Sequence, residues 1–341
     1  MTPIYLDNNS TTPIAPEVAA VMTECYAAQY VNPASQHQRG QQSRRKLETA
    51  RETIAEILGA EVTSFQSDTV VFTSGGTEAN NLAMFGLISP NNTSGNIVIS
   101  SIEHPSIIAT ADVMKQRGYE IRTAKVDQQG TVDVSHCLSL IDEQTQLVSI
   151  MLGNNETGAL QPVAEIAKVC RERNVLCHTD AAQVVGKLPV NFRELDVAAM
   201  TVTPHKLYGP RGIGTLLLRH GVELQPQIHG GFQQLGARPG TESVELAVGF
   251  AATLELWQRE SETRPAKLQH LRDLFEHKLL EKLPWIVINS SQAARLPHTS
   301  NIAFPGVDRQ ALIIALDMAG VYCSTGSACA SGSSELSPVL L

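Results

Sequence analysis

Short apolar runs alternate with segments of helical periodicity from about residue 70 to residue 218. The runs VVFTS, NIVIS, LVSIML and VLCHTD have the length and composition of buried strands. Patterns typical of helices follow the first three runs, in TEANNLAMFGLI, PSIIATADVMKQRG and PVAEIAKVCRERN. Residues 197–202 and 213–218 are predicted as two more core strands, joined by a tight glycine-rich connection. This alternation predicts a mainly parallel sheet with helices on both of its faces.

Helical patterns also flank this region. Residues 41–60 place apolar side chains on one helix face and reach Gly59, a residue type that often stops helices. These side chains are Leu47, Ala50, Ile54, Ile57 and Leu58. Residues 242–259 form a second apolar face, made of Ala247, Phe250, Ala251, Leu254 and Trp257, in a helix expected to leave the large domain. After about residue 263, a helix, two strand-like segments and another helix predict a smaller α+β domain.

Composition and charge exclude several classes of protein. The 341 residues carry a net charge of −8 and no basic run beyond SRRK, which argues against a nucleic-acid or anionic-membrane surface. No apolar segment approaches the roughly 20 residues that cross a bilayer, and the N-terminus does not resemble a signal peptide. The six cysteines show no C-x-x-C pair, so neither a metal site nor a disulfide framework is expected. We therefore expect a cytoplasmic protein that binds a small molecule.

Lys206 lies in the segment TVTPHKLYGPRGIG, at the end of a predicted core strand. In open α/β sheets, ligands bind in the crevice beyond the carboxyl ends of the strands. An amine held there can act as a nucleophile towards a carbonyl group. A solvated surface lysine beside a turn is the alternative interpretation.

Two further motifs follow predicted strands. In VVFTSGGTEANN, a strand runs into Gly75, Gly76 and Thr77 before a helix expected to begin at about Glu78, which makes an anion site. In VLCHTDAAQ, a strand ends at Asp180. Each motif alone also fits an ordinary turn or helix cap, with Thr77 or Asp180 as the capping residue. Enzymes that use pyridoxal phosphate (PLP) need a lysine for the Schiff base, an acid for the pyridine nitrogen and an anion cradle, and all three parts occur here.

Other polar side chains are expected at the same edge of the sheet. His104 follows the strand NIVIS and precedes a helix, so its imidazole could stack on a planar cofactor and move protons near neutral pH. A helix-capping or core histidine is the alternative. Asn155 and Gln183 can donate to the cofactor's phenolic oxygen, and Thr203 and His205 lie where they could bind its phosphate.

A run of small residues, VYCSTGSACASGSSELS, holds a second reactive group. It has few apolar anchors and is predicted to be a loop. Cys329 lies between Ala328 and Ala330 in this loop, which favours an exposed and therefore reactive thiol. An incidental surface cysteine is the alternative. Cys323 is interpreted as a buried structural cysteine on a strand.

The chain resembles the cysteine desulfurases of the NifS/IscS type, which belong to the PLP-dependent class V aminotransferase family. The motifs that carry the resemblance are YLDNNSTTP, NPASQHQRG, TSGGTEANNLA, EHPSI, NNETG, HTDAAQ, PHKLYGPRGIG, RPGTE and STGSACASGS. They span residues 4 to 341 in the family's order and approximate spacing. The resemblance implies a homodimer with the aspartate-aminotransferase-like fold (PLP fold type I), in which a mainly parallel seven-stranded sheet forms the large domain. Residues 16–258 would form that domain, and residues 1–15 and 259–341 the smaller α+β domain.

The resemblance also implies a role for each candidate residue. Lys206 would carry PLP as a Schiff base, Asp180 would pair with the ring nitrogen, and His104 would stack on the ring. The phenolic oxygen would bind the amides of Asn155 and Gln183. The phosphate would bind Gly76, Thr77, Thr203 and His205 of one subunit and Thr241 of the other.

The implied reaction converts L-cysteine to L-alanine. The cofactor weakens the substrate's C–S bond, and the Cys329 thiolate attacks the sulfur and becomes a persulfide. His104 and Lys206 are candidates to take the thiol proton. The sulfur would then pass to an acceptor or scaffold protein, for iron–sulfur cluster assembly or tRNA thiolation.

The sequence departs from the family pattern in three places. Thr203 and Pro204 stand where a serine and a small residue are usual, but a hydroxyl is kept, so phosphate binding is expected to survive. Gln234 stands where glutamate is common. The chain ends at SELSPVLL, whereas the family continues with a tail whose arginine pairs with the substrate's carboxylate, and no arginine follows Arg309. We expect a shortened form of a longer protein, with a degenerate family member as the alternative.

Other functions stay open at this point. A selenocysteine lyase, or another PLP-dependent lyase of the same fold, would explain the cofactor motifs without a role for Cys329. A non-catalytic scaffold in a sulfur-transfer assembly is the second alternative, and the missing arginine favours it. A bacterial source is expected, and an organelle form without its presequence fits the sequence equally well.

Overall fold

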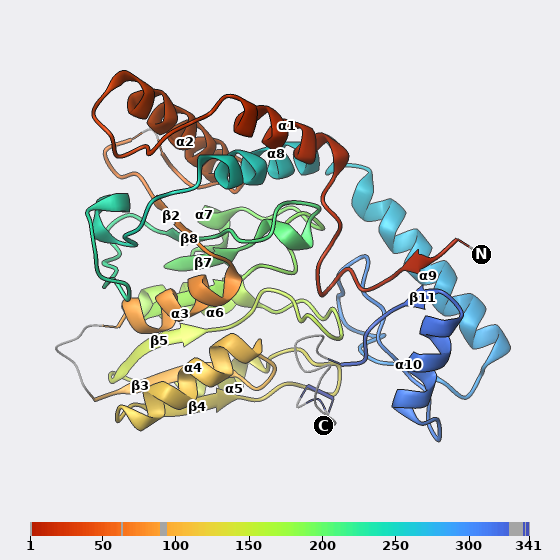
Figure 1. Cartoon of the computed structure of the whole chain (residues 1–341). Coiled ribbons are helices and arrows are strands. Elements are labelled where there is room, and N and C mark those ends of the chain that lie inside the picture. Colours follow the sequence, from red (N-terminus) through yellow and green to blue (C-terminus); the bar gives the residue numbers. More distant parts are fainter. Residues whose placement is uncertain (1, 63, 89–93, 327–336, 338, 341) are drawn as a thin grey trace.

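A seven-stranded sheet forms the centre of the molecule (Figure 1). The computed structural model describes residues 2–62, 64–88, 94–326, 337 and 339–340. The strands lie in the order β2-β8-β7-β6-β5-β3-β4. Their bounds are β2 Thr69–Thr73, β3 Asn96–Ser100, β4 Glu120–Ala124, β5 Thr145–Ser149, β6 Leu176–Asp180, β7 Ala199–Val202 and β8 Gly214–Leu218. Strand β8 is antiparallel to β2 and β7 and the other neighbouring pairs are parallel, so the predicted mainly parallel seven-stranded sheet is confirmed.

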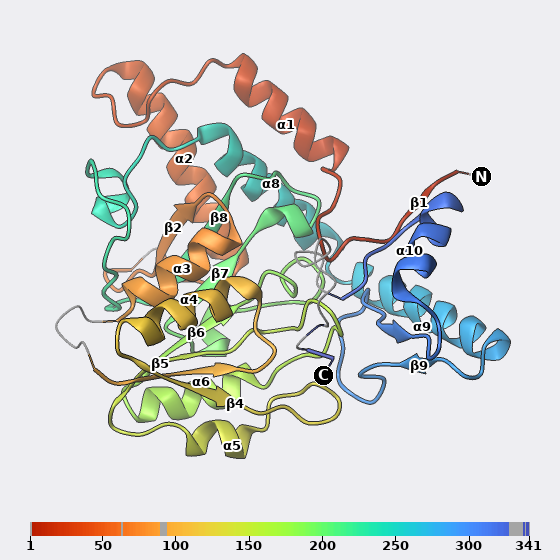
Figure 2. The same cartoon turned by 60° about the horizontal axis from the view of Figure 1, so that its bottom comes forward.

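Alternate side chains of each strand point to opposite faces of the sheet and enter two separate cores. In β3, for example, Val98 lies in one core, and Ile97 and Ile99 lie in the other. Helices α2, α6 and α8 contribute to the first core; α3 and α4 contribute to the second and lie over the strands in Figure 2. Their bounds are α2 Gln38–Ile57, α3 Gly76–Gly86, α4 Pro105–Gln116, α6 Val163–Glu172 and α8 Val244–Glu260. Burial on both faces explains why the strands are nearly uninterrupted apolar runs.

Helices α2 and α8 confirm the two helices predicted on either side of the alternating region. Gly59 follows α2 with φ +73°, and a Cβ there would lie only 2.5 Å from the Asn191 Oδ1, so glycine is required by both conformation and space. Helix α1 (Pro16–Ala27), which packs against α8 in Figure 1, was not predicted. Its pattern is weak because only Val18 and Cys25 are buried. The remaining short elements are α5 Val134–Ser139, α7 Phe192–Leu195, η1 Pro204–Lys206 and η2 Gln233–Gly236.

The chain leaves the large sheet through α9, as Figure 1 shows, and forms a group of smaller elements. Strands β9 and β10 pair antiparallel, and the N-terminal β1 pairs in parallel with β11 near the other end of the chain. The bounds are β1 Ile4–Tyr5, α9 Arg264–Lys282, β9 Val287–Ile288, β10 Ile302–Ala303, α10 Arg309–Met318 and β11 Val321–Tyr322. Because the β1–β11 pair joins both ends of the chain outside the large sheet, it supports our proposal that residues 1–15 and 259–341 form a domain separate from residues 16–258.

Four cysteines are buried free thiols: Cys25, Cys137, Cys170 and Cys177. Cys323 is only half-buried and follows β11, so its interpretation as a buried strand cysteine is wrong; the strand is two residues long and lies at the surface. Within the ranges given above, no group of histidine, cysteine, aspartate and glutamate side chains is arranged to hold a metal ion. None of the helices described here is long and apolar enough to cross a membrane.

We predict that Phe250→Ala lowers the free energy of unfolding by about 3–5 kcal/mol, because it leaves a cavity where a side chain with 0% exposure joins α8 to the first core. Chemical denaturation measures the change. Phe65→Ala is the matched control, and it should change stability by less than about 0.5 kcal/mol because Phe65 is fully exposed.

Candidate active site

The carboxyl ends of the parallel strands bring most of the predicted site residues to one edge of the sheet. The turn after β2 leads into α3, the turn after β3 carries His104, and Asn155 follows β5. Asp180 is the last residue of β6, and Lys206 ends the turn η1 that follows β7. The residues found at this edge are Gly76, Thr77, His104, Asn155, Asp180, Gln183, Thr203, His205 and Lys206.

Asp180 is a buried acid held at both carboxylate oxygens. Its Oδ2 accepts a hydrogen bond from Asn80 Nδ2 at 2.7 Å, and its Oδ1 accepts one from the Ala182 backbone N–H at 2.9 Å. The same Asn80 amide also donates to Ser106 Oγ at 2.9 Å. Asp180 therefore serves as a turn residue, as the alternative interpretation expected, and is also fixed in position as an acid at the site.

His104 caps helix α4, because its Nδ1 accepts a hydrogen bond from the Ser106 backbone N–H at 3.1 Å. The capping interpretation is therefore correct, and the cap fixes the orientation of the ring. Burial lowers the pKa of His104, the Asp180 carboxylate opposes this, and the charge of Lys206 lowers the pKa further. Hydrogen bonds through Asn80 and Ser106 link Asp180 to His104, whose imidazole is neutral at neutral pH.

Glu103, which the sequence analysis missed, is a buried carboxyl beside His104. Its Oε1 accepts hydrogen bonds from Ser100 Oγ and from the Met151 backbone N–H, whereas its Oε2 has no hydrogen-bond partner among the described residues. Burial raises the pKa of Glu103 to about 8, and the Asp180 carboxylate raises it too. Glu103 is therefore protonated at neutral pH.

The first turn of α3 lies where the anion cradle was predicted. The helix begins at Gly76, two residues before the predicted start, and Gly75 is its N-cap, so the alternative in which Thr77 is the cap is wrong. A Cβ on Gly76 would lie 3.7 Å from Thr203 Cγ2, which places two expected phosphate residues side by side. A Cβ on Gly214 would lie 2.6 Å from the Gly75 carbonyl carbon, so the close approach of β8 to this turn requires glycine.

An N-terminal segment stabilises the turn that carries Lys206, a role that was not predicted from the sequence. Thr12 donates to the His205 carbonyl from both its backbone N–H, at 2.8 Å, and its Oγ1, at 2.9 Å. The His205 Nδ1 lies 3.1 Å from Thr11 Oγ1. Burial, followed by the charges of Lys206, Lys187 and Arg211, lowers the pKa of His205 to about 4. His205 can therefore offer a hydrogen bond to a phosphate, but no charge.

Asn9, from the same N-terminal segment, links the two amides expected at the phenolic oxygen. Its Nδ2 donates to the Asn155 carbonyl at 3.0 Å, and its own carbonyl accepts from Gln183 Nε2 at 3.0 Å. The buried Gln183 Oε1 has no hydrogen-bond partner among the described residues. An unpaired buried amide oxygen is costly unless a ligand or water satisfies it, so this atom fits a polar ligand at the site.

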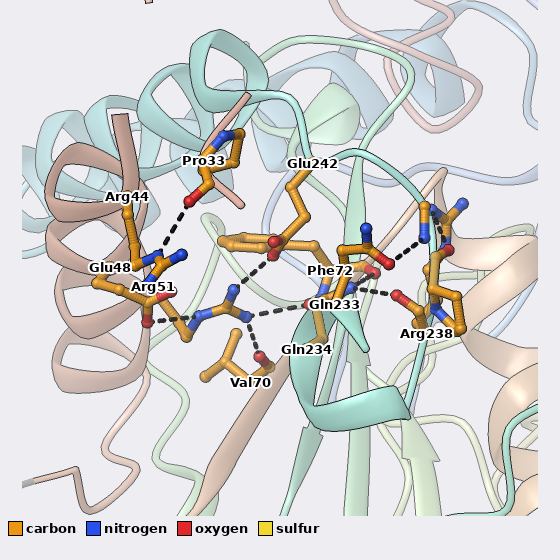
Figure 3. Close-up of polar contacts among 12 residues, drawn as sticks. Pro33, Arg44, Glu48, Arg51, Val70, Phe72, Gln233, Gln234, Arg238 and Glu242 are labelled. Carbon is orange, nitrogen blue, oxygen red and sulfur yellow. Dashed lines mark hydrogen bonds and ion pairs between the residues drawn. The ribbon is translucent and has the colours of Figure 1, made fainter. Parts of the chain in front are cut away.

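The loop before α8 is tied to the edge of the sheet (Figure 3). Gln234 pairs with β2 as a peptide group would: its Oε1 accepts from the Phe72 N–H at 2.7 Å, and its Nε2 donates to the Phe72 carbonyl at 2.9 Å. Arg51 of α2 donates to Gln234 Oε1 at 3.1 Å and to Glu242 Oε1 at 2.8 Å. Its guanidinium carbon lies 4.5 Å from the centroid of the Phe72 ring. Gln234 itself has φ +52°, a left-handed conformation that these contacts hold.

The same loop reaches the anion cradle through Arg238. Its Nε donates to Glu78 Oε1 at 2.7 Å, and Glu78 Oε2 accepts from the Ser74 backbone N–H at 2.7 Å. Thr241 follows in the loop and is exposed; within the part of the chain described, no hydrogen bond joins it to the other site residues. Its expected role on a partner subunit's phosphate is not contradicted by this position and stays a prediction.

Cys329 lies outside the described residues, but the two sides of its segment are defined. Ser337 Oγ donates to Glu156 Oε2 at 2.6 Å, and a Cβ on Gly326 would lie 3.5 Å from the same oxygen. Glu156 is the residue after Asn155. Gly326 and Ser337, the described residues on either side of positions 327–336, therefore both lie beside Glu156.

We predict that Glu103→Gln changes how stability depends on pH. The folded protein keeps a proton on Glu103 up to about pH 8, whereas an unfolded glutamate releases it near 4.5, so folding takes up a proton between these values. The parent's free energy of unfolding should therefore fall, relative to that of the variant, as the pH rises from about 4.5 to about 8. Denaturant unfolding at several pH values tests this, with the exposed Glu165→Gln as the control.

We also predict that Gln234→Leu lowers the free energy of unfolding by about 1–3 kcal/mol, because it removes the partners of the Phe72 backbone and of Arg51. The neighbouring Gln233→Leu is the matched control, since the Gln233 side chain accepts one long bond, 3.3 Å from the Gly240 N–H. Limited proteolysis should cut near residue 234 faster in the first variant than in the second. Equal effects of the two substitutions would contradict the prediction.

Comparison with known proteins agrees with this architecture. The chain matches the family described as aminotransferase class-V over residues 4–339. A cysteine desulfurase IscS from Dictyoglomus turgidum is 38% identical over 338 residues, which cover 99% of this chain and 84% of the relative. A cysteine desulfurase from Gluconacetobacter diazotrophicus is 38% identical over 341 residues, which cover 100% of this chain and 84% of that relative.

Two solved structures superpose closely on this chain. A NifS-like protein from Rickettsia africae has a TM-score of 0.88 at 34% identity, with 99% of this chain and 89% of that chain covered. The structure described as SspA in complex with cysteine has a TM-score of 0.85 at 30% identity, with 99% and 93% covered. These neighbours confirm the expected fold. The family match spans nearly the whole sequence, and this chain therefore belongs to the class-V aminotransferase family.

Proposed function

We propose that this chain is a PLP-dependent cysteine desulfurase, which converts L-cysteine to L-alanine and transfers the sulfur to Cys329 as a persulfide. The observation that carries the proposal is the edge of the sheet at which Lys206, Asp180 and His104 come together, with both sides of the Cys329 segment beside it. The relatives named as cysteine desulfurases and the neighbour described with bound cysteine support the same substrate.

The residues at this edge fit the cofactor. Lys206 would bind its aldehyde, Asp180 would pair with its ring nitrogen, and His104 would lie against its ring. The buried Asp180 carboxylate and the glycine turn at the start of α3, beside Thr203, support this fit. Two amides, Asn155 and Gln183, would face the phenolic oxygen, and Gly76, Thr77, Thr203 and His205 would hold the phosphate. When bound, PLP supplies an electron sink next to the substrate's α-carbon.

Three side chains of the protein, Asp180, His104 and Cys329, would carry out the other steps. Asp180 is fixed by Asn80 and by the Ala182 N–H, so it is positioned to hold a ring nitrogen without rearranging. His104 is neutral, and because its Nδ1 accepts from the Ser106 N–H, its ring proton lies on Nε2, from which it can be donated. Cys329 would attack as a thiolate: an S–S bond forms, the substrate's C–S bond breaks, and alanine leaves after its carbon is protonated.

We further propose a homodimer in which Thr241 completes the phosphate site of the partner subunit. Two side chains of the same loop, Phe232 and Leu235, are 79% and 82% exposed, while its polar side chains Gln234 and Arg238 point inward. A loop that turns its apolar side chains outward fits a protein partner. The persulfide sulfur would pass to an acceptor or scaffold protein, for iron–sulfur cluster assembly or tRNA thiolation, in the cytoplasm.

We predict that Cys329→Ala lowers sulfide release from L-cysteine by about two orders of magnitude or more, because no thiol remains to take the sulfur. Alanine and sulfide are measured with excess reductant, and the parent should give equal amounts of both. Cys323→Ala is the matched control, and it should keep the parent's rate. Lys206→Ala should abolish the covalent attachment of PLP, read as loss of the imine absorbance.

Three results would count against the proposal. Sulfide release that survives in Cys329→Ala would exclude the persulfide route. Turnover of selenocysteine without turnover of cysteine would indicate a selenocysteine lyase. A folded parent that binds no PLP would favour a non-catalytic scaffold.

A further inference from the structure

Asn80 is a buried amide of α3 whose role was not predicted from the sequence. The residue is 1% exposed. Of the buried residues of α3, it alone has a polar side chain; the others are Ala79, Leu82, Ala83, Met84 and Gly86. Asparagine is mostly an exposed residue, so a buried one on an apolar helix face needs an explanation. The hydrogen bonds of Asn80 provide one.

The two amide hydrogens of Asn80 reach two different elements at the edge of the sheet. One is donated to Asp180 Oδ2 at 2.7 Å, at the end of β6, and the other to Ser106 Oγ at 2.9 Å, in the first turn of α4. Ser106 Oγ in turn lies 2.7 Å from His104 Nδ1. Helices α3 and α4 lie side by side over the sheet in Figure 2, so one amide can bridge them. Two side chains therefore join Asp180 to His104.

The hydrogen bonds of this chain of side chains all have a defined direction. His104 Nδ1 accepts the Ser106 backbone N–H at 3.1 Å, so it carries a lone pair and no proton. Ser106 Oγ accepts from Asn80, and its own hydrogen is the one that it can donate to Nδ1. Turning the Asn80 amide over would place its oxygen against the Asp180 carboxylate, where both atoms are acceptors. The direction is therefore fixed at both ends.

This orientation leaves Asn80 Oδ1 buried without a hydrogen-bond partner among the described residues. An unpaired buried amide oxygen lowers stability, and a leucine of similar size would avoid that loss, so packing alone does not explain Asn80. Both donors to Asp180, the Asn80 amide and the Ala182 N–H, are uncharged. They orient the carboxylate without placing a positive charge beside it, which leaves it able to pair with a cationic group of a ligand.

We propose that Asn80 is a positioning residue of the cofactor site, which holds the ring acid Asp180 directly and the ring-stacking His104 through Ser106. Groups that are fixed before a ligand binds do not have to be ordered when it arrives, so less of the binding free energy is lost. One amide would thus align the group that pairs with the ring nitrogen and the group that lies against the ring. The inference rests on the proposed function, and it adds the residue that connects these two groups.

The first measurement follows His104 by nitrogen NMR in protein without bound cofactor. The full-length parent, Asn80→Leu, Ser106→Ala and the double variant carry isotopically labelled histidine, and His104→Gln identifies the His104 signals among the ten histidines. In the parent, Nδ1 should resonate as an unprotonated nitrogen that accepts hydrogen bonds. In both single variants its resonance should move to that of a more weakly bonded nitrogen. The double variant should show no further change, because both substitutions act through the same hydroxyl.

The second measurement compares the dissociation constants of PLP and of an analogue that has carbon in place of the ring nitrogen. Only PLP can pair with Asp180, so the parent should prefer PLP. Asn80→Leu should lower this preference about tenfold, because the carboxylate that makes the distinction loses one of its two hydrogen bonds. Ser106→Ala should keep the parent's preference, because the bond between Asn80 and Asp180 remains.

Asn96→Leu is the matched control. Asn96 is 0% exposed and donates to Asp142 Oδ1 at 2.8 Å, at the other end of β3 from His104. Loss of this equivalent bond should lower stability but leave both the His104 signals and the preference for PLP unchanged. Circular dichroism identifies the folded variants, and Asn80→Ala takes the place of Asn80→Leu if leucine prevents folding.

A folded Asn80 variant that keeps the parent's Nδ1 resonance, or the parent's preference for PLP, would overturn the proposal. A parent with its His104 ring proton on Nδ1 would overturn it too. If instead the parent binds no PLP, the proposed function fails, while the histidine signals still decide whether Asn80 orients His104.

Discussion

The whole arrangement depends on burying both faces of one sheet. Because alternate side chains of each strand enter opposite cores, the strands must run side by side between two layers of helices. Strand β8 then decides where the glycine turn lies. It is antiparallel to both β2 and β7, so β2 runs in the same direction as β7. The carboxyl end of β2, and with it Gly76, therefore meets Thr203 at the edge that also holds Asp180.

Desolvation decides the charge of several titratable groups at the site. Burial keeps His104 and His205 neutral by lowering the pKa of each, and it keeps Glu103 neutral by raising the pKa of that carboxyl. Two donors, Asn80 Nδ2 and the Ala182 N–H, hold the oxygens of Asp180 in place. The positive charges that surround the edge come from lysines and arginines. Such a site favours a ligand that carries both an anionic group and a ring nitrogen able to pair with a carboxylate. PLP has both, in its phosphate and its pyridine nitrogen.

Local motifs were enough to choose the residues proposed to touch the cofactor, because most of them lie in turns that follow strands. The residues that hold them in place were missed. Asn9 and Thr12 come from the opposite end of the chain and act through contacts with Gln183 and His205, which no local pattern reveals. The sequence showed Gln234 as a departure from the family pattern. Its hydrogen bond with the Phe72 backbone, however, is possible only because β2 is the edge strand of the sheet.

The alternation of strands and helices, the mainly parallel sheet and the choice of Lys206, Asp180 and His104 as a set could all be predicted from the sequence. These follow from periodicity and from the order of motifs, which are local properties of the chain. The direction of β8, the groups that lose their charge on burial and the contacts of Asn9 and Thr12 could be seen only in the folded chain. Those outcomes depend on contacts between segments far apart in sequence, since desolvation and hydrogen bonding are set by what surrounds a group and not by its neighbours along the chain.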